Sequence, residues 1–129
     1  VKTHCSNQKA ELVKLPGGLL ITPWHPVKVE GEWKFPSDLS ESEQMPCPAV
    51  YSFVLSSGHT MFINGIECIT LAHGKKGKVV EHEYLGTNRV LRLFSNFPSG
   101  IVELKAGGLL RNKETDLISG FAKKFEIVQ

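Results

Sequence analysis

Short runs of apolar and β-branched residues alternate with turn residues along most of the chain, a pattern typical of β-strands. Runs that predict strands cover residues 10–15, 19–22, 27–35, 49–55, 59–63, 66–71, 79–86, 89–94 and 101–104. Asn64-Gly65 separates two of these runs and predicts a hairpin, because both residues tolerate a positive φ. The pattern therefore predicts a mostly β fold built from many short strands.

Three segments depart from this alternation. Residues 37–48 are polar, lie between prolines and are expected to form a loop, and residues 74–78 form a second, basic loop. Near the C-terminus, apolar residues repeat at helical spacing and indicate a short helix; they are Leu117, Ile118, Phe121, Ala122 and Phe125. Gly120 lowers the helix propensity by about 1 kcal/mol relative to Ala, so a strand stays open as the alternative.

Length and composition narrow the class of protein. A chain of 129 residues indicates one domain, and its net charge of +2 predicts no strong attraction to nucleic acid or an anionic membrane. No apolar run approaches the ~18 residues of a membrane span, and the polar first residues do not resemble a signal peptide. Three cysteines without a CxxC pair favour a reducing, intracellular location, although one disulfide plus a free thiol stays open.

The segment Thr22-Pro23-Trp24-His25-Pro26 is the first candidate for chemistry. Pro23 fixes its own φ and Pro26 keeps His25 out of the helical region, so the segment is an extended or turn structure. A histidine can move a proton near neutral pH, and a threonine hydroxyl can bond a backbone amide. The competing interpretation is a loop histidine beside a core tryptophan.

The second candidate region is residues 50–74, which places His59, Cys68 and His73 around the predicted hairpin. A thiolate beside a histidine is a usual nucleophile, and the hairpin brings His59 and Cys68 to facing strands. The competing interpretation is a buried Cys68 that acts as a small hydrophobic residue, with His59 at the edge of a loop.

A metal site could use the same side chains together with Cys47. Thiolates and imidazoles bind zinc, but the spacing of Cys47, His59, Cys68 and His73 matches no known ligand pattern. The basic loop at 74–78 is expected to be a solvated charge run, because nothing beside it resembles a P-loop. We therefore expect no metal and no cofactor.

Taken together, the two candidate regions resemble a known superfamily. The stretch "LLITPWHPV" resembles the TxxH block of Hint domains, which inteins and Hedgehog autoprocessing domains share, and "VYSFVLSSGHTMFINGIECI" resembles the late intein block. The run of motifs over residues 15–87 is most similar to the Vint domain found with von Willebrand A modules. The resemblance implies a β-rich horseshoe, with residues 1–74 as a Hint core lacking its first block and 75–129 as an extension packed on the same domain.

The resemblance also implies a self-processing activity. In such domains a cysteine attacks the preceding carbonyl, and an N–S acyl shift converts the peptide bond to a thioester that is then cleaved. His25 would protonate the departing nitrogen, Thr22 would hold the peptide, and Cys68 would assist, with His59 and His73 as further candidates. Cys5 fits a later strand, so the nucleophilic cysteine is expected on another segment, and this chain is expected to be a fragment or split part that is inactive alone.

The partners that follow are the segment carrying that cysteine and a flanking extein-like protein. The late region carries no His-Asn pair before a nucleophile, so full splicing is not expected.

Two other functions stay open. One is a non-catalytic β interaction or scaffold module that keeps the Hint fold, and the other is a Cys-His hydrolase that acts on other proteins.

Overall fold

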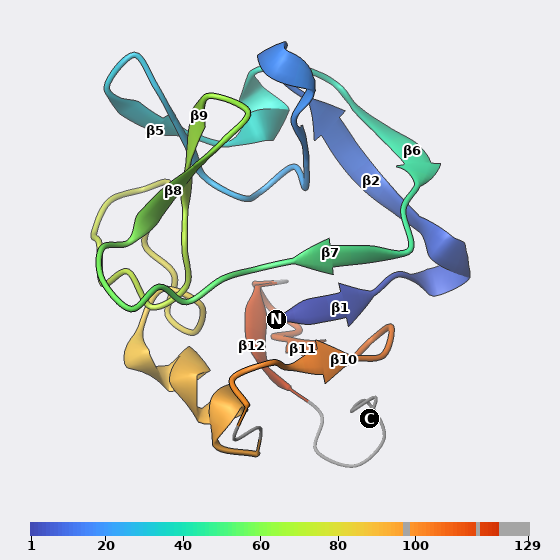
Figure 1. The fold of residues 1–129 in the computed structure, drawn as a ribbon, viewed down its shortest axis with the longest axis vertical. Helices are drawn as coiled ribbons and strands as arrows, with labels where there is room; N and C mark the ends of the chain where they lie inside the picture. Colours follow the sequence, from blue (N-terminus) through green and yellow to red (C-terminus); the bar gives the residue numbers. More distant parts are fainter. Residues whose placement is uncertain (97–98, 116, 122–129) are drawn as a thin grey trace.

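Short strands joined by tight turns make up most of the structure, which confirms the mostly β prediction (Figure 1). The computed structural model describes residues 1–96, 99–115 and 117–121. The strands are β1 (Lys2–His4), β2 (Lys9–Lys14), β3 (Leu20–Ile21), β4 (Val27–Val29), β5 (Glu32–Lys34), β6 (Ser42–Pro46), β7 (Ala49–Tyr51), β8 (Thr60–Ile63), β9 (Ile66–Ile69), β10 (Glu103–Leu104), β11 (Leu109–Arg111) and β12 (Ile118–Phe121). The 3₁₀ helices are η1 (Ser6–Gln8), η2 (Pro16–Gly18), η3 (Pro36–Asp38) and η4 (Asn88–Asn96).

These strands form four small sheets. Their strand orders are β3-β2-β6, β5-β4-β9-β8, β10-β1-β7 and β11-β12. All pairs are antiparallel except β1 with β10, which brings the first strand of the chain beside a strand about one hundred residues later. The amino group of Val1 donates to the Ser52 carbonyl at 2.6 Å, so the N-terminus is also tied to the segment after β7. The division of the domain at residue 74 stays a prediction.

Two hairpins follow from residues that adopt a positive φ. Asn64 and Gly65, at φ 50° and 82°, turn the chain between β8 and β9, as predicted. The predicted strand at residues 27–35 is divided by a similar turn at Glu30 and Gly31, with φ 53° and 80°. It therefore forms the hairpin β4–β5 and not one long strand.

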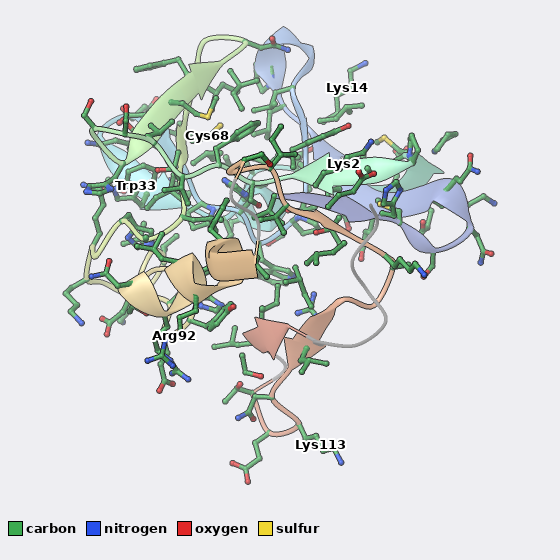
Figure 2. All side chains as sticks on the ribbon, turned by 60° about the horizontal axis from the view of Figure 1, so that its bottom comes forward. Lys2, Lys14, Trp33, Cys68, Arg92 and Lys113 are labelled. Atoms are coloured by element: carbon green, nitrogen blue, oxygen red, sulfur yellow. The ribbon has the colours of Figure 1, made fainter. Side chains whose placement is uncertain are left out.

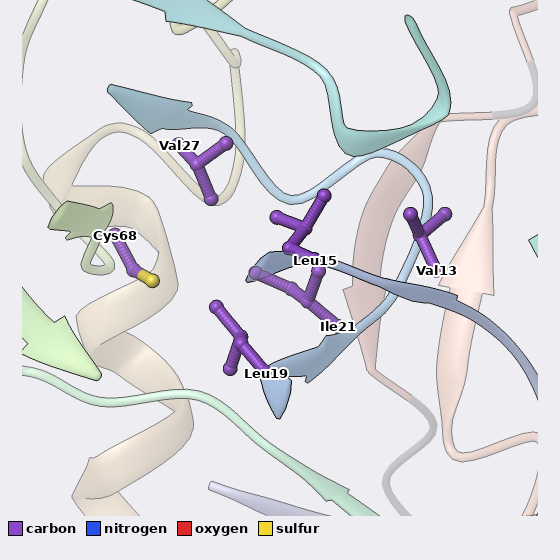
Figure 3. Packing of buried hydrophobic residues seen from close by; sticks show 6 residues of the cluster. All are labelled: Val13, Leu15, Leu19, Ile21, Val27 and Cys68. Carbon is purple, nitrogen blue, oxygen red and sulfur yellow. The ribbon is translucent and has the colours of Figure 1, made fainter. Parts of the chain in front are cut away.

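One cluster of buried side chains joins the two sheets of the N-terminal half. It consists of Val13, Leu15, Leu19, Ile21, Val27 and Cys68, from β2, β3, β4, β9 and the turn between β2 and β3. Figure 3 shows the Cys68 sulfur pointing toward the aliphatic side chains of this cluster. Two smaller clusters lie around Val90 and Leu93 in the C-terminal half. The N-terminal cluster fixes the relative position of the segments that carry the candidate site.

Some predicted elements are wrong. The expected loop at 37–48 contains most of η3 and all of β6, and β6 pairs with β2 along its whole length. Its residues are mostly polar because that strand is largely exposed, and an exposed strand has the composition of a loop. Residues 79–86 form turns, and the run at 89–94 lies within the 3₁₀ helix η4, where Val90 and Leu93 are buried three residues apart.

The prediction of a C-terminal helix is also wrong for the residues that the structure describes there. Residues 118–121 form β12, which pairs with β11, so the strand alternative holds there. The rest of that predicted helix, Asp116 and residues 122–129, lies outside the described residues. Figure 2 shows the β11–β12 hairpin extending from the body of the molecule, with Lys113 at its end.

Candidate functional site

A groove of about 470 Å³ lies between β3, β7 and the β8–β9 hairpin. The residues that line it come from three stretches of sequence and one isolated position; they are Leu19–Thr22 and His25, Pro46–Phe53, Met61, Ile63, Cys68 and Ile69, and Leu12. Most of these side chains are apolar, and a few polar groups are placed among them, which is the usual composition of a binding site. Thr22, His25 and Cys68, three of the five predicted site residues, share this groove.

The segment Thr22–Pro26 is a turn, as the two prolines predict. The His25 amide donates to the Thr22 carbonyl at 3.3 Å, and the Ser37 amide donates to the Pro23 carbonyl at 3.1 Å. Trp24 is 68% exposed and packs edge-on against Phe35, with 5.3 Å between ring centroids. The competing interpretation of a histidine beside a core tryptophan therefore does not describe this turn, because Trp24 lies on the surface.

The imidazole of His25 is held against β9. Its Nε2 lies 2.8 Å from the Ile69 carbonyl oxygen, and the Ile69 amide donates to the Pro26 carbonyl at 3.1 Å. A carbonyl only accepts, so Nε2 carries the proton and Nδ1 of the neutral ring carries a free lone pair. Burial lowers the pKa of His25 below its usual value, and the bond to Ile69 partly opposes this. His25 is therefore neutral at pH 7 and can accept a proton.

The Thr22 hydroxyl is the second polar group of the groove. The Thr22 side chain is half-buried, and within the described part of the chain its hydroxyl makes no hydrogen bond. A hydroxyl can donate one hydrogen bond and accept others. It can therefore bind the backbone of an extended peptide that enters the groove.

Cys68 contributes a thiol beside this pair, but in a non-nucleophilic state. Its side chain is 1% exposed, and Sγ donates weakly to the Ile66 carbonyl at 3.5 Å. Burial, and then the nearby Glu67 carboxylate, raise the pKa of the thiol, so it is protonated at neutral pH. The expectation of a buried, hydrophobe-like Cys68 describes this geometry.

His59 and His73 lie outside the groove. His59 is exposed at the start of β8, and its backbone carbonyl accepts from Thr70 at 2.9 Å. His59 lies close enough to His73 to affect its pKa, and among the described residues no hydrogen bond joins the exposed His59 to the buried Cys68. The hairpin therefore does not create the predicted thiol–imidazole pair.

His73 has a clear structural environment. Its Nδ1 accepts from the Lys75 amide at 2.8 Å, and its ring also bonds the Val80 backbone. Burial, followed by the charges of neighbouring groups, lowers the pKa of His73. A Cβ on Gly86 would lie 2.9 Å from His73 Nε2, so the ring packs directly on this glycine. These contacts show how His73 organises the turns after β9, and its catalytic role stays a prediction.

Two participants were missed from the sequence. The Ile69 carbonyl orients His25, yet backbone atoms carry no sequence signal. Cys47 also lines the groove, in the segment Pro46-Cys47-Pro48. The sequence pattern predicts a loop at Cys47 and suggests this residue only as a metal ligand, and only the pairing of β6 with β2 and of β7 with β1 brings this segment to the groove.

In the described ranges, no group of three or more His, Cys, Asp or Glu side chains is arranged to hold a metal ion. None of the helices in the same part of the chain has the length and apolarity needed to cross a membrane.

Comparison with known proteins gives one clear match. The family model Vint, described as a Hint-domain, matches residues 1–120. No curated protein matches the chain. The matched range contains both motif regions, all of the groove and most of the C-terminal extension. The chain therefore belongs to the Vint family of Hint domains.

Proposed function

We propose that this Hint domain processes a peptide bond held in the groove, by an N–S acyl shift followed by cleavage of the thioester. The observation that carries this proposal is the convergence of Thr22 and His25 on one groove, with His25 held neutral by burial and oriented by Ile69. Membership of the Hint family supports it, because Hint domains are generally self-processing. Most of the side chains that line the groove are apolar, which suits a peptide segment with apolar side chains.

In this proposal the reacting cysteine is none of Cys5, Cys47 and Cys68, and it comes from a different segment. The amides of Cys5 and Cys47 are bonded to the Pro48 and Gln8 carbonyls, so the peptide bonds that precede both residues are fixed within the fold. Cys68 lies in β9, opposite Val27 and Met61, and is buried. The proposed partners are therefore a cysteine-led segment that enters the groove and the flanking extein-like protein attached to it.

The proposed reaction uses the groove residues in a defined order. The thiol of the incoming cysteine attacks the carbonyl carbon of the residue before it, and the thiol proton passes to Nδ1 of His25. The carbon–nitrogen bond breaks, His25 returns the proton to the departing amine, and a thioester replaces the amide. Thr22 bonds the peptide backbone and holds it in place. Water or another nucleophile then cleaves the thioester and releases the thiol.

A reconstitution experiment tests this proposal. The purified chain is mixed with a reporter protein fused to the cysteine-led segment of its precursor, and reporter release is followed with and without hydroxylamine. We expect release that hydroxylamine accelerates, since it attacks thioesters. Removing a general acid–base group costs about 10²- to 10⁴-fold in rate, so His25→Ala should lose release on that scale. Thr22→Val should slow release by a smaller factor.

The matched control is His4→Ala. His4 does not line the groove, and its Nε2 pairs with Glu103 at 2.6 Å. This variant should process at the normal rate. Equal release by folded His25→Ala would contradict the catalytic role and would support the alternative of a non-catalytic β module.

A further inference from the structure

Two cysteines that are distant in sequence lie on neighbouring chain segments. Cys5 follows β1, and Cys47 lies between β6 and β7. The Cys5 amide donates to the Pro48 carbonyl at 2.9 Å, and the Cys47 amide donates to the Gln8 carbonyl at 2.8 Å. These two backbone hydrogen bonds flank the pair and continue the β1–β7 and β2–β6 ladders. They place Cys5 opposite Pro48 and Cys47 opposite Gln8, so the two cysteines are offset by one position and lie on directly adjacent stretches of backbone.

The two side chains also lie close together. The Cys47 thiol is near enough to the Cys5 thiol to interact with it, and Cys47 Sγ lies 3.2 Å from the Ala49 carbonyl, to which it can donate. Both residues are partly exposed, so a small molecule in solution can reach them. Burial, and then the neighbouring Cys47, raise the pKa of the Cys5 thiol. Cys68 differs from both because it is buried in the core.

We propose that Cys5 and Cys47 form a reversible disulfide through exchange with a small-molecule disulfide such as oxidised glutathione. One cysteine, as a thiolate, attacks a sulfur of oxidised glutathione and displaces one glutathione thiolate. The second cysteine then attacks the first cysteine's sulfur in this mixed disulfide, forms the Cys5–Cys47 bond and displaces the other glutathione as a thiolate. The two protein thiols lose two electrons and two protons, and one oxidised glutathione is reduced to two glutathione molecules.

The crosslink has a consequence for the groove. Pro46, Cys47 and Pro48 line the groove, so the disulfide would tie this part of the groove lining to Cys5 at the end of β1. An effect of oxidation on peptide processing rests on the proposed function, whereas formation of the bond does not. The bond is therefore tested by direct chemical analysis, without any measurement of activity.

The experiment treats the folded chain with oxidised glutathione, quenches it with acid and counts free thiols after unfolding. We expect the number of free thiols to fall from three to one. Cleavage after glutamate separates the cysteines into fragments 1–11, 44–67 and 68–81. Mass spectrometry should find fragment 1–11 joined to fragment 44–67, in an amount at least tenfold greater than that of any crosslinked product containing 68–81. A reducing agent should separate the two joined fragments.

Variants complete the test. Cys68→Ala should keep the crosslink, whereas Cys5→Ser should lose it and retain glutathione on Cys47. Three free thiols after prolonged oxidation would overturn the proposal. Glutathione adducts on both cysteines without a link, or a dominant crosslink that includes 68–81, would also overturn it.

Discussion

Oxidation of Cys5 and Cys47 should stabilise the fold by an amount that the length of the closed loop determines. The two residues enclose a loop of about 40 residues, for which the chain-entropy relation gives a loss of about 13 cal/mol/K in the unfolded state, or about 4 kcal/mol at 25 °C. This value is an upper limit, because distortion of the native state subtracts from it. The backbone hydrogen bonds to Pro48 and Gln8 already hold the two segments together, so the distortion should be small.

Urea unfolding measures this stabilisation. With a denaturant dependence of about 2 kcal/mol per M for a domain of this size, 4 kcal/mol corresponds to a midpoint about 2 M higher in the oxidised protein. The emission of Trp33, which is half-buried beside Lys28, and far-ultraviolet circular dichroism should report the same transition. The reduced protein is the reference, and both forms are checked for thiol content before unfolding.

The control is Cys5→Ser, whose midpoint should not depend on redox conditions. Cys68→Ala should be less stable in both states and should keep the full difference between them. An oxidised protein with a verified crosslink and a midpoint raised by less than about 0.5 M, or about 1 kcal/mol, would refute the reasoning. Such a result would mean that the disulfide strains the native strands.

Three further predictions concern the groove and its supports. Stability should fall as the pH drops below 6.5, the ordinary pKa of His25, because burial lowers its pKa in the folded state and the unfolded chain binds the proton first. The urea midpoint should be lower at pH 5.5 than at pH 7.5, and the difference should be smaller in His25→Gln. An equal difference in this variant would mean that other groups cause the pH dependence. Gly17→Ala should cost more stability than Gly18→Ala in thermal unfolding. Both have a φ above 80°, but only at Gly17 would a Cβ lie 2.7 Å from the Asn64 carbonyl oxygen, so equal losses would contradict this close contact. Val27→Ala removes two methyl groups from a site with 0% exposure and should cost roughly 2–4 kcal/mol in urea unfolding, whereas a loss below about 1 kcal/mol would mean that the core closes around the gap.

The candidate site combines a tether and a reactive group in one side chain. His25 holds the turn to β9 through Nε2 and leaves Nδ1 with a free lone pair. A substitution at this position therefore affects both stability and the proposed chemistry. The rates of His25 variants need to be compared at temperatures where each variant is folded, so that the loss of the tether is not mistaken for the loss of a proton donor.

The sequence by itself determined the features that depend on neighbouring residues. Alternating apolar runs identified most strands, Asn64-Gly65 identified the β8–β9 turn, and two prolines identified the turn that carries Thr22 and His25. The motifs over residues 15–87 identified the family, which the match to Vint confirmed. Each of these signals is local, because turn chemistry and strand periodicity act within a few residues.

Only the tertiary structure decided which distant groups meet. The bond from His25 to Ile69 joins residues 44 positions apart, and the β1–β7 and β2–β6 pairs together bring Cys5 close to Cys47. The exposed strand β6 and the 3₁₀ helix η4 were also misjudged, because their composition resembles a loop and a strand, while their conformation depends on what they pack against. Long-range pairing is set by the packing of the whole core, and no short stretch of sequence contains that information.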